Sequence, residues 1–398
     1  MMTPEERERA VQDMMAKATL EERKQMKAQQ EQMKRELEQA SPEERQQMAR
    51  EAHMMRELGV FCKTLLPDSA DPDKPIGTVA VLAAMAECSS FEALSMAIKS
   101  LEMEKQKAVV RTFITMEQAL LKHATEADAT ALRELKIKPE KKRPLLLLLW
   151  VMYKNKTPDA VELDEHVQQY VDAGRSFATQ LFMRAQVALP RQRLVQPTLA
   201  VSRTAALFVN ELWSHEDDDC KRRMAEILAP ADTPDAGLPY PKLELKARTV
   251  KTLELEQGNA GDLNSVSCSV PAVGFPGQSI SVQVELVRLH AGLGNSAPVA
   301  NCEANPQGIL EAYWLYIEGH MPGGKPNALL AAKPLTVTDL TVSSCTSAPN
   351  FVAPKEAGEY KVTAHIASTS VVGCDMSLTL SFQVEEDDVP ALDDVPVA

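Results

Sequence analysis

Long apolar runs are missing from this chain of 398 residues. The longest run, Leu145–Tyr153, has nine residues, whereas a helix that spans a membrane needs about 20. The N-terminal residues are charged from Glu5 onward and lack the apolar core of a secretion signal. We therefore expect neither a transmembrane helix nor a signal peptide.

Patterns typical of catalytic or metal chemistry are also missing. The seven cysteines form no C-x-x-C motif, and an odd number without a secretion signal favours a reducing compartment. Cys268 is in phase with Val266 and Val270, so we expect it to fill a core. The seven histidines show no spacing typical of a metal site, and no G-x-S-x-G sequence is present. The sequence therefore predicts no cofactor, no metal and no enzyme activity.

An excess of basic residues is missing as well. The chain has 43 lysines and arginines against 56 aspartates and glutamates, a net charge of −13. This balance argues against nucleic acid as the main partner, because phosphate binding needs a basic surface. A local basic patch remains, and it is either a solvated loop or a site for anionic lipid heads or an acidic partner. Its residues are Lys136, Lys138, Lys141, Lys142, Arg143 and Lys154.

Two short motifs suggest ligands but lack the residues that those ligands need. Gly319–Lys325 fits the G-x4-G-K part of a phosphate-binding loop, but Pro326 stands where the Mg²⁺-binding Ser or Thr belongs. Because strands are expected on both sides, we interpret this segment as a loop between strands. The acidic block Glu216–Asp219 lacks the spacing of a calcium loop and is interpreted as the start of a helix, where acids complement the dipole.

The charged segment 1–59 repeats one phrase, Ser or Thr followed three residues later by Glu. This capping box predicts helices that begin near Thr3, Thr19 and Ser41, with proline at the first helical position in two of them. Methionines supply a soft apolar stripe along these helices. The segment is either a solvated helical arm or an arm that docks a partner.

Residues 75–230 have a helical period throughout and predict an all-α domain. Because Leu145–Trp150 is apolar on every side, we expect its helix to be central. Residues 231–262 are interpreted as a linker that contains several prolines; the period of 243–255 is ambiguous. The expected helices are Ile76–Cys88, Ser90–Met103, Lys107–Ala124, Pro144–Lys154, Asp159–Leu189, Pro197–Trp213 and Asp217–Leu228.

From residue 263 to 386 the apolar period changes to two, which predicts antiparallel strands. About seven strands in roughly 120 residues indicate an immunoglobulin- or fibronectin-like β-sandwich, so the whole chain is expected to be an α+β multidomain protein. The tail 387–398 is acidic and broken by prolines, which predicts disorder. The clearest alternations are Val266–Val270, Ile280–Leu286, Ala312–Ile317, Leu335–Val342, Tyr360–Ile366 and Met376–Val384.

The last two of these strands flank a polar corner, Ser368–Asp375. Within the corner, Gly373 and Asp375 are expected to be structural, through a turn and a side chain that bonds to the backbone. Pro354, Gly358 and Tyr360 shape the preceding turn and strand. His365 alternates with apolar neighbours and is expected to face solvent.

Several segments fall in the order found in the cytosolic part of the Sec sixty-three family. That family is the J-protein partner of the protein-conducting channel of the endoplasmic reticulum, and this chain resembles it over roughly 75–385. The corner departs from the family pattern at Thr369 and Val371, and the chain has no J domain. The segments that carry the resemblance are Gln196–Leu199, Glu211–Trp213, Leu238–Tyr240, Glu311–Ile317, Asn327–Lys333, Phe351–Pro354, Gly358–Tyr360 and Ser368–Asp375.

The resemblance implies a non-enzymatic subunit that supports protein translocation. It would lie at the cytosolic face of the endoplasmic reticulum membrane and bind channel subunits and the basic Sec sixty-two partner. The alternatives are a cytosolic scaffold that uses the same module for another partner, or the module of an RNA-helicase-like assembly. The implied partner-binding residues are two aromatics on one strand and the acids of the tail: Trp314, Tyr316, Glu385, Glu386, Asp387, Asp388, Asp393 and Asp394.

Overall fold

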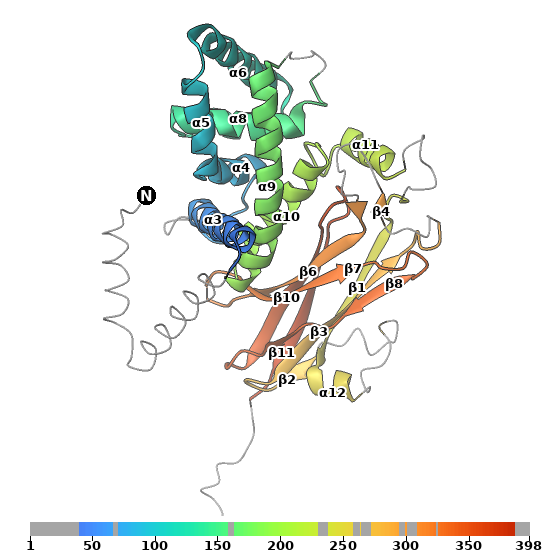
Figure 1. Cartoon of the computed structure of the whole chain (residues 1–398). Coiled ribbons are helices and arrows are strands. Elements are labelled where there is room, and N and C mark those ends of the chain that lie inside the picture. The colour runs from blue at the N-terminus through green and yellow to red at the C-terminus, as the bar shows by residue number, and fades with distance from the viewer. Residues whose placement is uncertain are drawn as a thin grey trace, which may run out of the picture. The chain divides into compact units, whose positions relative to one another are not determined.

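The computed structural model combines helices with β-sheets (Figure 1). It describes residues 40–66, 71–157, 163–229, 238–257, 263, 272–293, 299–300, 309–323 and 325–386. The chain divides into two compact units, Met1–Arg56 and Glu57–Ala398, so most helices share a unit with the strands. Within the described ranges no helix has the length and apolar character to cross a membrane. The five-part division expected from the sequence stays a prediction.

Most described helices form where the apolar period predicts them. Two helices were not predicted: α12 (Thr252–Glu256), which lies in the segment interpreted as a linker, and α7, in which the Thr125 side chain caps the helix by accepting a hydrogen bond from the Asp128 N–H. The helices are α3 (Pro42–Leu65), α4 (Thr78–Ala86), α5 (Ser90–Lys99), α6 (Met103–His123), α7 (Glu126–Glu134), α8 (Pro139–Tyr153), α9 (Glu165–Arg191), α10 (Val195–Val209), α11 (Asp218–Leu228) and α12 (Thr252–Glu256).

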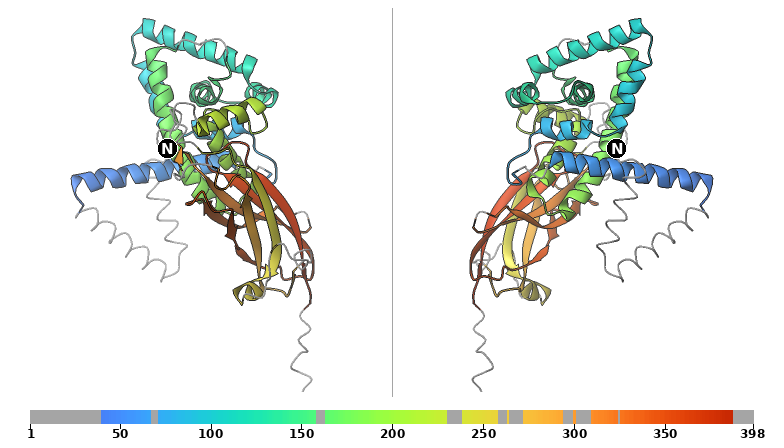
Figure 2. Two further views of the ribbon diagram at one scale, coloured as in Figure 1. Left: turned by 90° about the vertical axis from the view of Figure 1, so that its right-hand side faces the viewer. Right: turned by 90° about the vertical axis from the view of Figure 1, so that its left-hand side faces the viewer.

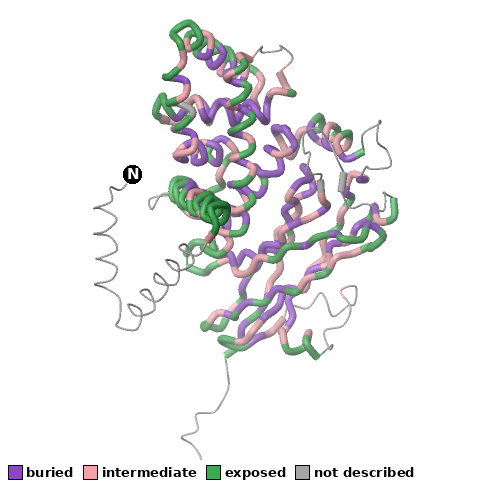
Figure 3. The backbone as a smooth tube through the Cα atoms, viewed as in Figure 1, coloured by how far each residue is buried: buried purple, intermediate pink, exposed green. Residues whose placement is uncertain are grey.

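Helix α8 is central, as its all-round apolar sequence predicts. Every residue from Pro144 to Tyr153 is buried, and the helix contacts α4, α5, α6, α9 and α10. Figure 3 shows buried positions in both the helices and the strands. Burial on every side leaves α8 no free apolar face, so its role is to hold the helical part together.

Helix α3 extends further than the sequence suggested. It begins at the predicted capping box, where the Ser41 N–H donates to the Glu44 carboxylate and the Glu44 N–H donates to the Ser41 hydroxyl. It then continues through Gly59 to Leu65, past the expected end of the charged helical segment at residue 59. Leu58, Phe61 and Leu65 recur at helical spacing and are buried, and this packing outweighs the low helix propensity of one glycine. The other two predicted capping boxes lie outside the described residues.

Over the described residues, the strands form a four-stranded sheet, a five-stranded sheet and a short pair. The first has the order β1-β3-β8, with β9 also paired to β3, and the second has the order β2-β11-β10-β6-β7. The strands are β1 (Leu243–Lys251), β2 (Val273–Gly274), β3 (Ser279–Arg288), β4 (Val299–Ala300), β5 (Ile309–Leu310), β6 (Ala312–His320), β7 (Ala328–Thr336), β8 (Ser344–Ser347), β9 (Asn350–Val352), β10 (Gly358–Ser368) and β11 (Met376–Val384).

The two larger sheets pack against each other (Figure 2). Phe351 of the first sheet meets Phe382 of the second edge to face, with ring centroids 5.5 Å apart. Tyr360 stacks on the same Phe382 ring from the neighbouring strand, at 5.6 Å. Helix α10 covers part of β10 on the other side, so β10 is buried on both faces over much of its length.

Two segments of the β region differ from expectation. Residues 243–251, left within the linker, form β1, whose alternating charges suit the edge of a sheet. The strand expected over 335–342 ends at Thr336, because the following chain turns away: the Leu340 and Val342 carbonyls accept hydrogen bonds from the Arg288 guanidinium. The strand expected at 266–270, with Cys268, lies outside the described residues.

Candidate functional site

The corner Ser368–Asp375 is closed by its own hydrogen bonds. The Asp375 carboxylate accepts from the Ser368 N–H at 3.0 Å, and the Ser368 hydroxyl accepts from the Val371 N–H at 2.9 Å. Gly373 has φ +85°, and a Cβ there would lie 2.7 Å from the Tyr240 hydroxyl. Glycine is therefore required at this turn by backbone conformation and by space.

Residues from the helical part dock on this corner. Arg203 of α10 pairs with Asp375 at 3.2 Å. Buried Asn210, at the end of α10, donates to the Ser370 carbonyl at 2.6 Å. The Tyr240 hydroxyl donates to the Val372 carbonyl at 2.9 Å. The corner thus connects three segments that are far apart in the sequence.

Both aromatic residues expected to bind a partner, Trp314 and Tyr316, lie in this helix–sheet contact. Tyr316 is 0% exposed, and its hydroxyl lies 2.9 Å from that of Ser202 on α10; burial raises its pKa. Trp314 stacks on Tyr316 with ring centroids 5.8 Å apart. Tyr316 is therefore occupied inside the chain and offers no surface to a partner, whereas half-buried Trp314 also lines a cavity.

The remaining predicted site residues are placed only in part. Pro354 lies in the loop between β9 and β10. Gly358 begins β10 opposite Val384, and the Tyr360 hydroxyl donates to the Glu356 carbonyl at 2.8 Å. Glu385 and Glu386 are exposed after β11. Four acids of the tail lie outside the described residues: Asp387, Asp388, Asp393 and Asp394.

His365 does not face solvent, contrary to expectation. Its Nε2 lies 2.7 Å from the carboxylate of Glu318 on β6, and both side chains are mostly buried. Burial alone would raise the Glu318 pKa, but hydrogen bonds from His365 and Asn327 outweigh it and lower the pKa. The second face of β10 is covered as well as the first, so a polar residue on that face pairs inside the protein and does not face solvent.

Arg288, His290, Glu311 and Tyr313, here called the Arg288 group, form a buried polar cluster. Arg288 grips the Glu311 carboxylate with two nitrogens, at 2.8 and 2.7 Å. The Tyr313 hydroxyl donates to Glu311 at 3.0 Å. The Lys242 N–H donates to His290 Nδ1, which leaves Nε2 to donate to Glu311. Every member is at most 2% exposed, so no substrate reaches these groups.

The charge on Glu311 is strongly stabilised. Burial would raise its pKa, but hydrogen bonds from His290 and Arg288, together with the charge of the Arg288 guanidinium, lower the pKa to about 2. Burial raises the pKa of neighbouring Tyr313. The group is therefore an ion pair with extra hydrogen bonds, the arrangement in which a buried salt bridge persists. No sequence motif marked it, because its members come from separate strands and loops.

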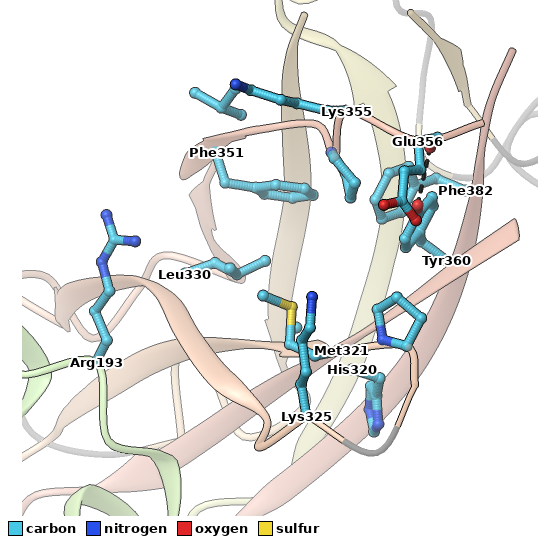
Figure 4. A pocket seen from close by; sticks show the side chains of 14 residues that line it. Arg193, His320, Met321, Lys325, Leu330, Phe351, Lys355, Glu356, Tyr360 and Phe382 are labelled. Atoms are coloured by element: carbon cyan, nitrogen blue, oxygen red, sulfur yellow. Dashed lines mark hydrogen bonds between the residues drawn. The ribbon is translucent and has the colours of Figure 1, made fainter. Parts of the chain in front are cut away.

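A cavity of about 310 Å³ opens beside the rings that join the two sheets. We call it the aromatic cavity; Figure 4 shows its lining. Its wall includes the aromatic side chains of Phe351, Tyr360 and Phe382 together with Leu330 and Met321. Lys325 comes from the loop between β6 and β7 that resembles a phosphate loop in sequence, and its side chain points among these apolar groups (Figure 4).

Three exposed cations surround the aromatic cavity: Arg193, Lys325 and Lys355. In the described part of the chain their side chains form no ion pair. The lining contains one carboxylate, Glu356, and the imidazole of His320. The cavity thus carries an excess of unpaired positive charge, although the whole chain has a net charge of −13.

A second cavity, of about 400 Å³, lies between the end of α9 and the outer strand β7. We call it the edge cavity. Val187, Pro190, Trp314 and Pro334 contribute to its largely apolar lining, with Arg191 beside them. Arg193 and Leu330 line both cavities, so the two hollows adjoin along the start of β7.

The predicted basic patch is not a free surface. Lys141 is buried and bonds to the Glu87 carbonyl, Lys142 pairs with Glu117 at 2.7 Å, and Lys154 pairs with Glu211 at 2.8 Å. Arg143 lies over the Phe113 ring. These contacts leave Lys136 and Lys138 as the exposed cations of the patch.

The acidic block at 216–219 begins a helix, as predicted. The Asp217 side chain caps α11 by accepting from the Asp219 N–H at 2.9 Å. The Trp213 indole N–H also donates to Asp217, and this bond lowers the Asp217 pKa. Across the described ranges, no group of three His, Cys, Asp or Glu side chains is arranged to hold a metal ion.

Comparisons with known proteins identify neither a family nor a function for this chain. No protein-family model matches the chain, and no curated protein matches it. Among solved structures, a β-glucosidase from Listeria innocua is 11% identical, with a TM-score of 0.20, over 38% of this chain and 17% of its own. A CARDB domain from Pyrococcus furiosus, solved with di-metal ions, is 11% identical, with a TM-score of 0.21, over 37% of this chain and 90% of its own. Scores this low carry no argument about fold or function.

Proposed function

We propose that this chain is a non-enzymatic protein-interaction module like the cytosolic part of the Sec sixty-three family. It supports protein translocation at the cytosolic face of the endoplasmic reticulum. In this proposal the two packed sheets are an immunoglobulin- or fibronectin-like sandwich, and the helices before them form its companion domain. Channel subunits and a basic Sec sixty-two partner are the expected ligands, the latter recruited by the acidic tail through electrostatic steering.

The proposal draws support from the strands that coincide with the resembling segments. Strand β6 covers most of Glu311–Ile317, and β7 overlaps Asn327–Lys333. The turn after Phe351–Pro354 leads into β10 at Gly358. Strands β6, β7 and β10 belong to the five-stranded sheet, and Phe351–Pro354 precedes β10 in the chain. This arrangement is compatible with an architecture shared with the Sec sixty-three family.

The observation that carries the proposal is the docking of the helical part on the corner. Asn210 and Tyr240 both donate to corner carbonyls, and Arg203 pairs with Asp375. If the helices separated from the sheet, Asn210 would exchange its hydrogen bond to the Ser370 carbonyl for one to water, at a net cost of about 0.5–1.5 kcal/mol. Helix α10 and the sheet are thereby held together, which suits an interaction module.

A binding role also fits the chemistry better than catalysis does. The Arg288 group combines a carboxylate, an imidazole and a phenol, but it is closed to substrate. The open cavities instead have apolar walls with unpaired cations at the rim, a lining that suits a bound partner.

The test is affinity purification from a mild-detergent lysate, with the tag at the N-terminus so that the acidic tail stays free. We expect channel subunits or the basic Sec sixty-two partner at near-stoichiometric yield. A matched chain that lacks residues 387–398 should lose the basic partner. Absence of both, with the protein wholly in the soluble fraction, would overturn the translocation role and favour a cytosolic scaffold.

A further inference from the structure

We propose that the aromatic cavity and the edge cavity together bind one extended peptide segment of a partner protein. A carboxylate side chain of the peptide meets Arg193, and an apolar side chain on either side enters each cavity. This inference rests on the proposed interaction role and specifies the chemistry of one partner. It assigns a binding function to Arg193, Lys325 and Lys355. The sequence alone predicted no binding function for these residues.

Arg193 is fixed at the boundary between the two cavities. It has φ +59°, a left-handed conformation that is uncommon for residues other than glycine, asparagine and aspartate. Its carbonyl accepts a hydrogen bond from the Leu329 N–H at 3.0 Å, which pins the connection between α9 and α10 to the start of β7. Strained backbone that is held in this way occurs preferentially at binding sites.

The charges around Arg193 select for an anion. The lining of the aromatic cavity has three cations and one carboxylate, Glu356, and Arg191 adds a fourth cation beside the edge cavity. A guanidinium group can bind a carboxylate through two parallel hydrogen bonds, and this pair is stronger and more specific than a hydrogen bond between neutral groups. Because Arg193 is exposed and its side chain has no ion-pair partner in the described ranges, it can form this contact without breaking another.

The cavity walls select for apolar side chains on both sides of the carboxylate. The aromatic cavity, at about 310 Å³, has room for one large side chain among Leu330, Phe351 and Phe382. The edge cavity offers Val187, Pro190 and Trp314. A chain that passes Arg193 in an extended conformation places alternate side chains on one face, so one segment can reach both hollows.

Strand addition to β7 is a less suitable mode. Lys333 and Pro334 are exposed on this outer strand, and both residue types protect sheet edges from pairing. Nucleic acid is also disfavoured, because Phe351 and Phe382 pack edge to face within the cavity wall and form no exposed platform on which successive bases could stack. A peptide held by side chains is the occupant that these features favour.

The experiment measures fluorescence anisotropy of labelled nine-residue peptides on the full chain. Each peptide has one glutamate between two phenylalanines in a Ser/Gly background, with either one or three residues between the glutamate and each phenylalanine, so that all three side chains lie on one face of an extended chain. We expect saturable binding at one of these spacings. Glutamine in place of the glutamate should weaken binding about tenfold, as expected for the loss of a charge-assisted hydrogen bond.

The protein variant is Arg193→Asn, because asparagine removes the charge yet tolerates a left-handed conformation. This variant should bind the glutamate peptide about tenfold more weakly than the wild type does, and it should bind the glutamine peptide with the wild-type affinity. The four affinities form a double-mutant cycle for the contact between Arg193 and the peptide glutamate. Arg133→Asn, on the exposed face of α7, is the matched control and should change the affinity for neither peptide. Equal thermal unfolding midpoints would show that the variants are folded.

Three results would each overturn this inference. The first is that neither spacing gives saturable binding, and the second is that Arg193→Asn lowers the affinity for both peptides equally. The third is that a nine-nucleotide single strand displaces the bound peptide completely. The outcome is separable from that of the translocation role. Channel subunits that co-purify equally with wild type and with Arg193→Asn would leave the module role standing and reject this site. Specific peptide binding by a protein that co-purifies with no channel subunits would support this site and reject the translocation role.

Discussion

The Arg288 group and the rim of the two cavities contain similar charged side chains in opposite settings. Arg288 is fully buried and bound on every side, by Glu311 and by two backbone carbonyls. Arg193 is exposed, and its charge has no partner in the described ranges. The comparison teaches that a satisfied charge stabilises the fold, whereas an unsatisfied charge beside a cavity is available for recognition.

Removing the charge of Glu311 should have the largest effect. Glu311→Gln leaves the Arg288 guanidinium buried without its counter-charge, which should cost about 3–5 kcal/mol in the free energy of unfolding. Urea denaturation followed by circular dichroism measures the loss. The double variant Arg288→Met with Glu311→Leu should lose much less. A loss below about 1 kcal/mol in Glu311→Gln would show that the group behaves like a surface pair.

Acid should act on the same group. Because the folded-state pKa of Glu311 is lowered to about 2, its stabilising effect is present above the unfolded value and is lost as pH falls from about 4.5. Urea midpoints measured between pH 6 and pH 3 should therefore fall in the wild type. The fall should be shallower in Glu311→Gln, whose side chain does not titrate. Parallel curves for the two proteins would contradict this assignment.

Glu318 is an intermediate case, buried but paired with one histidine. Glu318→Gln keeps one of the two acceptor oxygens that face His365 and Asn327 and removes the charge, so we expect a loss of about 1–2 kcal/mol. Denaturant midpoints give the value. His365→Gln should cost a similar amount, and the double variant should cost less than the sum because the two residues share a contact. Strict additivity would mean that they do not interact.

The cavity cations should matter least for stability. Lys325→Gln and Arg193→Asn should each change the free energy of unfolding by less than about 0.5 kcal/mol, because exposed side chains without partners contribute little to the folded state. Lys105→Gln, exposed on α6, provides the matched control. A loss above about 1 kcal/mol in either cavity variant would show that the side chain supports the fold, and the contrast with Arg288 would disappear.

Much of the local structure could be predicted because it depends on neighbours in the sequence. The caps at Ser41 and Asp217 and the apolar surround of α8 are local patterns, and the structure has them. The errors have tertiary causes. Helix α3 continues past Gly59 because Phe61 and Leu65 are buried, and the predicted strand after Thr336 is replaced by a loop that wraps Arg288.

The candidate site could not be predicted in the same way. Arg193, Lys325, Phe351 and Phe382 lie in separate segments, and none of them belongs to a motif with a recognised ligand. Lys325 drew notice only through an incomplete phosphate-loop pattern. Tyr316 was expected to bind a partner because the resemblance to the Sec sixty-three family implies it, but α10 covers Tyr316 and Ser202 occupies its hydroxyl.

The sequence by itself determined the positions of most helices and of several strands, where several helices begin, and that the chain is acidic overall. Those properties follow from the spacing of apolar residues and from capping, which act over a few residues. Only the tertiary structure decided which charges are buried in pairs and which remain at a cavity. That distinction depends on contacts between distant segments, because a side chain's environment is set by the elements packed around it and not by its neighbours in the chain.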